Sequence, residues 1–180
     1  MRNASRVRFQ TGLVGITVLA LAGCGGIDTK RMVPETTNPT GQRFEQSLKI
    51  VEPIGGQKSK FGVQDYVENP EMHSALMGAF REAGLFSSVT DSGAADLELH
   101  TEIIEVAASG GFDMTFAFVT QYWLVDPKSG EEIWRKGINA RNEEKLKDTW
   151  SGSGRAVKAL EGAVRTNIQR LIEALAKADI

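Results

Sequence analysis

The sequence predicts an α+β fold, a two-layer sandwich in which two helices lie on one face of a mostly antiparallel sheet of about four strands. Hydrophobic and polar residues alternate over residues 95–106, 112–125 and 131–141, as they do in strands with one buried face. Residues 70–84 and 154–178 instead carry hydrophobic residues at spacings of three and four, which is the period of an amphipathic helix. Since no internal repeat or second domain is visible, we expect one domain over residues 44–180.

The first 23 residues have the layout of a secretory signal peptide. Arg2, Arg6 and Arg8 precede an apolar run over residues 11–23, with no acidic residue among them. The run is shorter than the roughly 20 residues that a bilayer-spanning helix needs. We therefore expect residues 1–23 to be removed, which leaves a mature chain more acidic than the formal charge of −2 of the whole sequence.

Residues 21–24, Leu-Ala-Gly-Cys, contain the only cysteine of the chain, Cys24. They resemble the lipobox of bacterial lipoprotein precursors. This resemblance implies cleavage before Cys24 and acylation of Cys24 with palmitate-like chains, and two or more such chains anchor a protein stably. Because Gly25 and Gly26 follow the cysteine in place of an aspartate, the same resemblance implies the outer membrane rather than the inner one. The alternative is an ordinary signal peptide with a chance cysteine.

Residues 24–43 are expected to be the lipidated N-terminus and a flexible tether. The stretch is mostly polar, contains Pro34 and Pro39, and shows no hydrophobic period. Residues 46–52 are expected to form a short strand that Pro53 ends.

Residues 54–69 form a connection that is long for a compact domain, and such loops are often functional. Phe61 and Tyr66 within it either fold back on the body or present a partner-binding surface. Asn69 and Pro70 then suit the cap and the first position of a helix, and Gly84 is well placed to end it. Residues 86–89 add at most a short extended piece.

The three longer strands follow. Over residues 95–106 the expected inward residues are Leu97, Leu99, Thr101 and Ile103, and over residues 112–125 they are Phe112, Met114, Phe116, Phe118, Tyr122 and Leu124. Residues 126–130, Asp-Pro-Lys-Ser-Gly, predict a tight turn. Gly137 in the strand over residues 131–141 indicates a bulge. Ser153 is the expected cap of the last helix.

Candidate sites for chemistry are few. Glu98, His100 and Glu102 share one strand face and could hold a metal or work as acid and base, but a solvated strand face is the simpler interpretation. His73 lies on an apolar helix stripe, where a packed histidine is more common than a ligand. The Ser/Gly-rich residues 151–154 lack the ending of a phosphate-binding P-loop. We expect no catalytic residue, no metal site and no cofactor apart from the covalent lipid.

The aromatic band over residues 112–123 could line a lipid pocket, although at strand spacing it more often forms core. Val119 and Trp123 fall on the opposite face from the phenylalanines. If the helices cover only one face, these two residues form an exposed apolar patch, which is typical of an interface.

The order of elements is similar to that of small periplasm-facing lipoproteins of the YajG, LpoB and CsgG-like group, which share a domain like the N-terminal domain of TolB. The matching stretches are residues 83–86, 95–99 and 125–134 and the last helix. The resemblance implies a non-catalytic adaptor or assembly factor that binds an envelope protein. The alternatives are an accessory lipoprotein in lipid or lipopolysaccharide transport and, less favoured, an enzyme acting on the cell wall. The sequence shows no clustered basic face of the kind that binds nucleic acid. Self-association into a homo-oligomer stays open.

Overall fold

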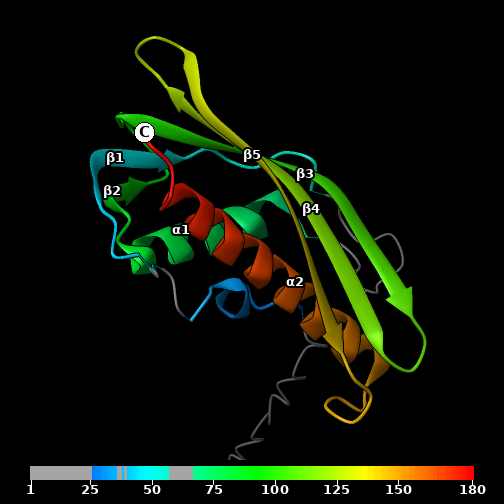
Figure 1. Cartoon of the computed structure of the whole chain (residues 1–180). Helices are drawn as coiled ribbons and strands as arrows, with labels where there is room; N and C mark the ends of the chain where they lie inside the picture. Colours follow the sequence, from blue (N-terminus) through cyan, green and yellow to red (C-terminus); the bar gives the residue numbers. More distant parts are fainter. Residues whose placement is uncertain (1–25, 36–37, 39, 57–66) are drawn as a thin grey trace, which may run out of the picture.

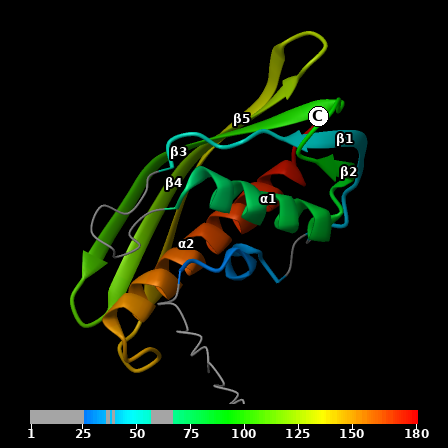
Figure 2. The ribbon, with the colours of Figure 1, turned by 180° about the vertical axis from the view of Figure 1, so that it is seen from behind.

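The computed structural model describes residues 26–35, 38, 40–56 and 67–180. Along the chain the elements are η1 (Thr29–Met32), β1 (Phe44–Ile50), α1 (Asn69–Ala83), β2 (Phe86–Thr90), β3 (Leu97–Gly110), β4 (Met114–Asp126), β5 (Glu131–Glu144) and α2 (Gly152–Leu175). In both overall views the two helices lie together on one side of a curved sheet (Figures 1 and 2). The α+β class is therefore as expected.

The sheet has five strands in the order β2-β1-β3-β4-β5, and it is mixed. β1 is parallel to both β2 and β3, whereas β3–β4 and β4–β5 are antiparallel hairpins. The prediction of about four mostly antiparallel strands therefore missed β2 as a fifth strand. After β1 the chain crosses over through α1 and returns parallel to β1, as β-helix-β connections do. The short extended piece predicted over residues 86–89 is therefore an edge strand.

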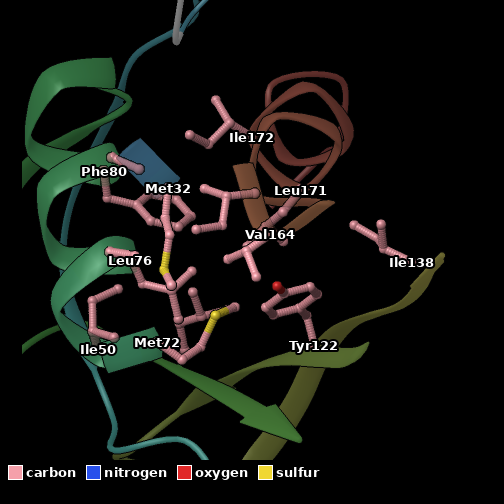
Figure 3. Close-up of a cluster of buried hydrophobic side chains, with 14 of the residues drawn as sticks. Met32, Ile50, Met72, Leu76, Phe80, Tyr122, Ile138, Val164, Leu171 and Ile172 are labelled. Carbon is pink, nitrogen blue, oxygen red and sulfur yellow. The ribbon is translucent and has the colours of Figure 1, made fainter. Parts of the chain in front are cut away.

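One hydrophobic core fills the space between the layers. It contains buried inward residues of β4 and of both helices, and Figure 3 shows part of it. Leu76 and Phe80 come from α1, Val164 and Leu171 from α2, and Tyr122 from β4. Because every second residue of β4 from Phe116 to Leu124 is buried, the predicted alternation is confirmed.

The predicted N-caps of both helices were wrong. The cap of α1 is Glu68 rather than Asn69, and the Glu68 N–H donates to Glu71 in the first turn (3.0 Å). The cap of α2 is Ser151 rather than Ser153, because the hydroxyl of Ser151 accepts from the Gly154 N–H. Gly84 does end α1, with a φ of 57° that suits glycine.

The aromatic strand begins later than predicted. Phe112 lies before β4, in the β3–β4 turn, and is 79% exposed instead of facing the core. Gly110, with a φ of 122°, ends β3 before this turn. Gly137 pairs regularly with Gln121, so it makes no bulge; the irregularity of the β4–β5 pairing lies at Leu124 and Val125.

The expected tether is, in part, a docked segment. Residues 27–34, here called the N-terminal strap, pack on both helices, and Met32 is completely buried. The Asp28 N–H donates to the carboxylate of Glu161 on α2 (2.8 Å), and Arg31 lies 3.6 Å from the same group. The strap escapes a pattern search because a short segment wedged between helices has no period.

A buried polar cluster joins α2 to the sheet. The side-chain oxygen of Asn167 accepts hydrogen bonds from the hydroxyls of Thr120 and Tyr122, and its amide nitrogen donates to the carbonyls of Phe118 and Ile138. Asn167 is fully buried, so each of these bonds compensates for lost contact with water. They set the position of α2 across β4 and β5.

Candidate functional site

The sheet face turned away from the helices carries the most organised set of polar and aromatic side chains. We call Lys49, Glu98, His100, Trp123 and Arg135 the outer-face row. These residues come from β1, β3, β4 and β5, and register places His100 opposite Trp123 and Trp123 opposite Arg135. Cross-strand partners of this kind have side chains in contact distance.

Trp123 is the centre of the row. Its ring stacks on the His100 ring, with centroids 5.4 Å apart and an interplanar angle of 13°. The guanidinium carbon of Arg135 lies 5.0 Å from the centroid of the same ring, a cation–π arrangement. Two neighbouring strands therefore hold the indole in one orientation.

Charged pairs support both ends of the row. On the β1 side, Lys49 donates to Glu98 at 2.9 Å, and this hydrogen bond lowers the pKa of Glu98 below its usual value. The other carboxylate oxygen of Glu98 lies 3.5 Å from Nε2 of His100. On the β5 side, Arg135 forms a two-pronged pair with Glu132 and lowers the pKa of that carboxylate.

This arrangement combines several kinds of chemical contact. A fixed indole flanked by an imidazole and a guanidinium offers apolar area, ring stacking and charged hydrogen bonds to another molecule. Among the described residues, no group of three or more His, Cys, Asp and Glu side chains could hold a metal ion. Glu102 sits opposite Gln121, and its charge acts on Arg135. Glu98, His100 and Glu102 do not form a group that could hold a metal ion in the described part of the chain.

The predicted patch of Val119 and Trp123 is only partly present. Both residues lie on the outer face as expected, but each is half-buried and Gln121 separates them along β4. His100 and Arg135 cover much of the Trp123 ring, so the two residues do not form a continuous exposed apolar patch. Instead the face combines aromatic and charged groups.

The remaining candidate residues lie away from the outer-face row or outside the described residues. Cys24, Phe61 and Tyr66 lie outside the described residues. His73 is half-buried, and its Nε2 donates to the carbonyl of Ile50 (3.1 Å), so it helps to fasten α1 to β1.

The strand aromatics form core rather than a lipid pocket. Phe116, Phe118, Tyr122 and Leu124 have no solvent exposure and pack in one cluster with both helices. A groove of about 480 Å³ between the strap and α1 is lined by Lys30, Met77 and their neighbours and by no strand residue.

Sequence reasoning missed the partners of Trp123. Alternation places His100 on a solvent-facing side of its strand and says nothing of its neighbour, because the register between strands depends on the length and geometry of the connecting turn. Trp150, between β5 and α2, was also passed over. Its side chain is 89% exposed, more than any other large hydrophobic side chain among the described residues.

Comparison with known proteins gives a likeness of fold. No family model and no curated protein matches the chain. Among solved structures, protein XCC0632 from Xanthomonas campestris, described as a member of family DUF330, is similar with a TM-score of 0.62 and 12% identity over 78% of this chain and 89% of that one. Hypothetical protein CT253 from Chlamydia trachomatis has a TM-score of 0.52 and 7% identity over 73% and 98% of the two chains. PelC from Paraburkholderia phytofirmans, a dodecamer, has 0.51 and 14% over 80% and 95%. At these identities the likeness shows the fold alone.

Proposed function

We propose that the chain is a lipid-anchored lipoprotein of the bacterial envelope that acts as a non-catalytic adaptor for another envelope protein. The anchor is Cys24, within a Leu-Ala-Gly-Cys motif that follows a basic and then apolar segment. No helix among the described residues is long and apolar enough to cross a membrane. An acylated Cys24 would supply the attachment, and Gly25 and Gly26 favour the outer membrane.

The observation that carries the adaptor role is the contact of Trp123 with His100 and Arg135 on the outer sheet face, here called the Trp123 clamp. Tryptophan, tyrosine and arginine are enriched among the residues that contribute most to binding at protein interfaces. Here His100 and Arg135 hold the indole in position before any partner arrives, which reduces the entropy lost on binding. The helices cover the opposite face, so this one stays open to another protein.

The interior supports an adaptor over a carrier of lipids. The alternative role in lipid or lipopolysaccharide transport calls for a cavity that receives acyl chains, and the aromatic residues of β4 fill the core instead. An enzymatic role lacks support among the described residues, since no nucleophile with an adjacent base accompanies the outer-face row.

Photo-crosslinking in living cells tests the adaptor role. A photoreactive amino acid at Gln121, which shares the face and strand of Trp123, is expected to capture one envelope protein. The matched control is Glu82, exposed on α1 on the other side of the molecule. The capture at position 121 is expected to fall at least about tenfold when Trp123→Ala removes the indole, as for a central interface residue.

Two results would contradict the adaptor role as stated. Equal capture at positions 121 and 82 would show that the outer face is not special. Capture of a second copy of this chain would assign the face to self-assembly instead of a foreign partner.

A further inference from the structure

Two exposed aromatic side chains lie at the same end of the molecule. Phe112, in the β3–β4 turn, is 79% exposed, and Trp150, in the β5–α2 loop, is 89% exposed. Both connections lie at one end of the long hairpins, opposite the β4–β5 turn (Figure 1). A hydrogen bond from the Leu146 N–H to Asp113 (2.9 Å) joins the turn to the loop. We call residues 111–113 and 145–151 the loop end.

The loop that carries Trp150 is held in place by hydrogen bonds. One guanidinium nitrogen of Arg155, a largely buried residue, donates to the carbonyls of Thr149 and Trp150, both at 2.8 Å. The hydroxyl of Thr149 donates to Glu144 and accepts from Lys158. These hydrogen bonds hold the backbone of the loop in place. The surrounding structure therefore fixes the position from which the exposed indole of Trp150 projects.

The strap places the start of the folded chain near this end. Asp28 is bound to Glu161, the tenth residue of α2, which lies about 14 Å along the helix from Gly152. Arg31 is bound further along, where its carbonyl accepts from Arg165, so the strap runs in the same direction as α2. Its beginning therefore points toward the end of α2 at which Trp150 lies.

Very little chain separates the strap from the proposed anchor. Three residues lead from Cys24 to Ile27, and they span at most about 10 Å. An acylated Cys24 consequently holds the N-terminal half of α2 close to the bilayer surface. A longer free tether, as residues 24–43 were expected to be, would have allowed the domain any orientation.

We propose that the loop end rests on the membrane, with Phe112 and Trp150 inserted among the lipid headgroups. The proposal rests on the lipid anchor at Cys24. Indole rings favour the boundary between headgroups and acyl chains, because one part of the ring is apolar and its N–H needs a polar partner. Lys145 and Lys147 are exposed at the loop end together with Asp113 and Asp148. The formal charges there balance, so the two aromatic side chains carry the contact with the membrane.

This contact fixes the orientation of the domain. With the loop end on the bilayer, the β4–β5 turn points away from it, and the outer sheet face stands at an angle to the surface where a periplasmic partner can reach it. The anchor and the two aromatic residues together give three points of attachment, enough to define a plane.

Nitroxide labels on the full-length, natively acylated protein in vesicles of phosphatidylethanolamine and phosphatidylglycerol test the proposal. Since Cys24 is the only cysteine, Phe112→Cys, Trp150→Cys and Ser129→Cys each provide one free thiol. Ser129, exposed in the β4–β5 turn, is the matched control at the far end. All three positions are exposed, so the substitutions leave the core intact.

Labels at positions 112 and 150 are expected to be more accessible to oxygen than to a water-soluble nickel chelate, and the label at 129 to show the reverse. The same water-like pattern at all three positions, with the protein still floating with the vesicles, would overturn this orientation and leave the anchor standing. A wild-type chain that reacts with the label at Cys24 would show a free thiol and overturn the anchor and the orientation together.

Discussion

The hydroxyl of Tyr122 on β4 donates a hydrogen bond of 2.7 Å to the side-chain oxygen of Asn167 on α2, with both residues fully buried. This bond lies within the core below the outer-face row, and Trp123 is the next residue of the same strand. The position of α2 and the position of the clamp are therefore linked through β4.

Replacing Asn167 by leucine should destabilise the fold strongly. Asn167→Leu keeps the approximate volume but leaves the hydroxyls of Thr120 and Tyr122 without their acceptor, and we expect a loss of about 2–4 kcal/mol in the free energy of unfolding. Thr166→Ala is the control, since the hydroxyl of Thr166 donates to the carbonyl of Gly162 within the same helix. Urea denaturation of both variants measures the difference. Equal losses of unfolding free energy in the two variants would show that the buried polar cluster stabilises the fold no more than one hydrogen bond within the helix.

Stability should fall in alkaline solution because of Tyr122. Burial raises the pKa of Tyr122 above its ordinary value, so the folded protein keeps the phenol proton after an unfolded chain has lost it. The stabilisation is fully present below pH about 10, the unfolded pKa, and is lost as pH rises further, by up to about 1.4 kcal/mol per pH unit.

Denaturation between about pH 8 and about pH 11 checks this dependence. Tyr122→Phe is the reference: it lowers stability at neutral pH but should remove most of the alkaline decline. A decline of the same slope in Tyr122→Phe would mean that other groups cause it.

The N-terminal strap should contribute to stability in spite of its shortness. Met32→Ala removes a fully buried side chain between the helices, and we expect a cost of about 2–4 kcal/mol. Lys30→Ala, at an exposed position of the same turn, should change stability by less than about 0.5 kcal/mol. A thermal melt that is unchanged in Met32→Ala would show that the strap is not docked in solution.

Gly162 and Asn142 should be energetically coupled. A Cβ built on Gly162 of α2 would lie 2.2 Å from the side-chain nitrogen of Asn142 on β5, so the end of the Asn142 side chain fills the space that a methyl group at position 162 would need. We expect Gly162→Ala to destabilise the natural chain and to stabilise an Asn142→Ala background, where alanine favours the helix by about 1 kcal/mol. A double-mutant cycle on unfolding free energies measures this. Additive changes would contradict the close approach.

Patterns within one segment predicted much of this fold. Alternation identified the faces of β3 and β4, and Pro70 with Gly84 marked the limits of α1. These signals are local, because side-chain period and backbone geometry are properties of a single element. The Asp-Pro-Lys-Ser-Gly turn was equally clear, and Gly130 there has a φ of 75°.

What escaped prediction depends on contacts between distant segments. β2 becomes a strand because it pairs with β1, and the strap becomes part of the core because Met32 meets both helices. The candidate site shows the same limit: the outer placement of Trp123 followed from alternation, but its neighbours His100 and Arg135 are set by strand register. The exposure of Phe112 followed from the point where the β3–β4 turn begins, which alternation placed too early.

The lipid anchor is tested by mass spectrometry of the mature N-terminus, on protein taken from the membrane fraction of cells that express the full chain. We expect the chain to begin at Cys24 and to carry a diacylglyceryl group on its sulfur, and we expect Cys24→Ser to release the protein from the membrane. A chain that is uncut, or that begins at an unmodified Cys24, would contradict it.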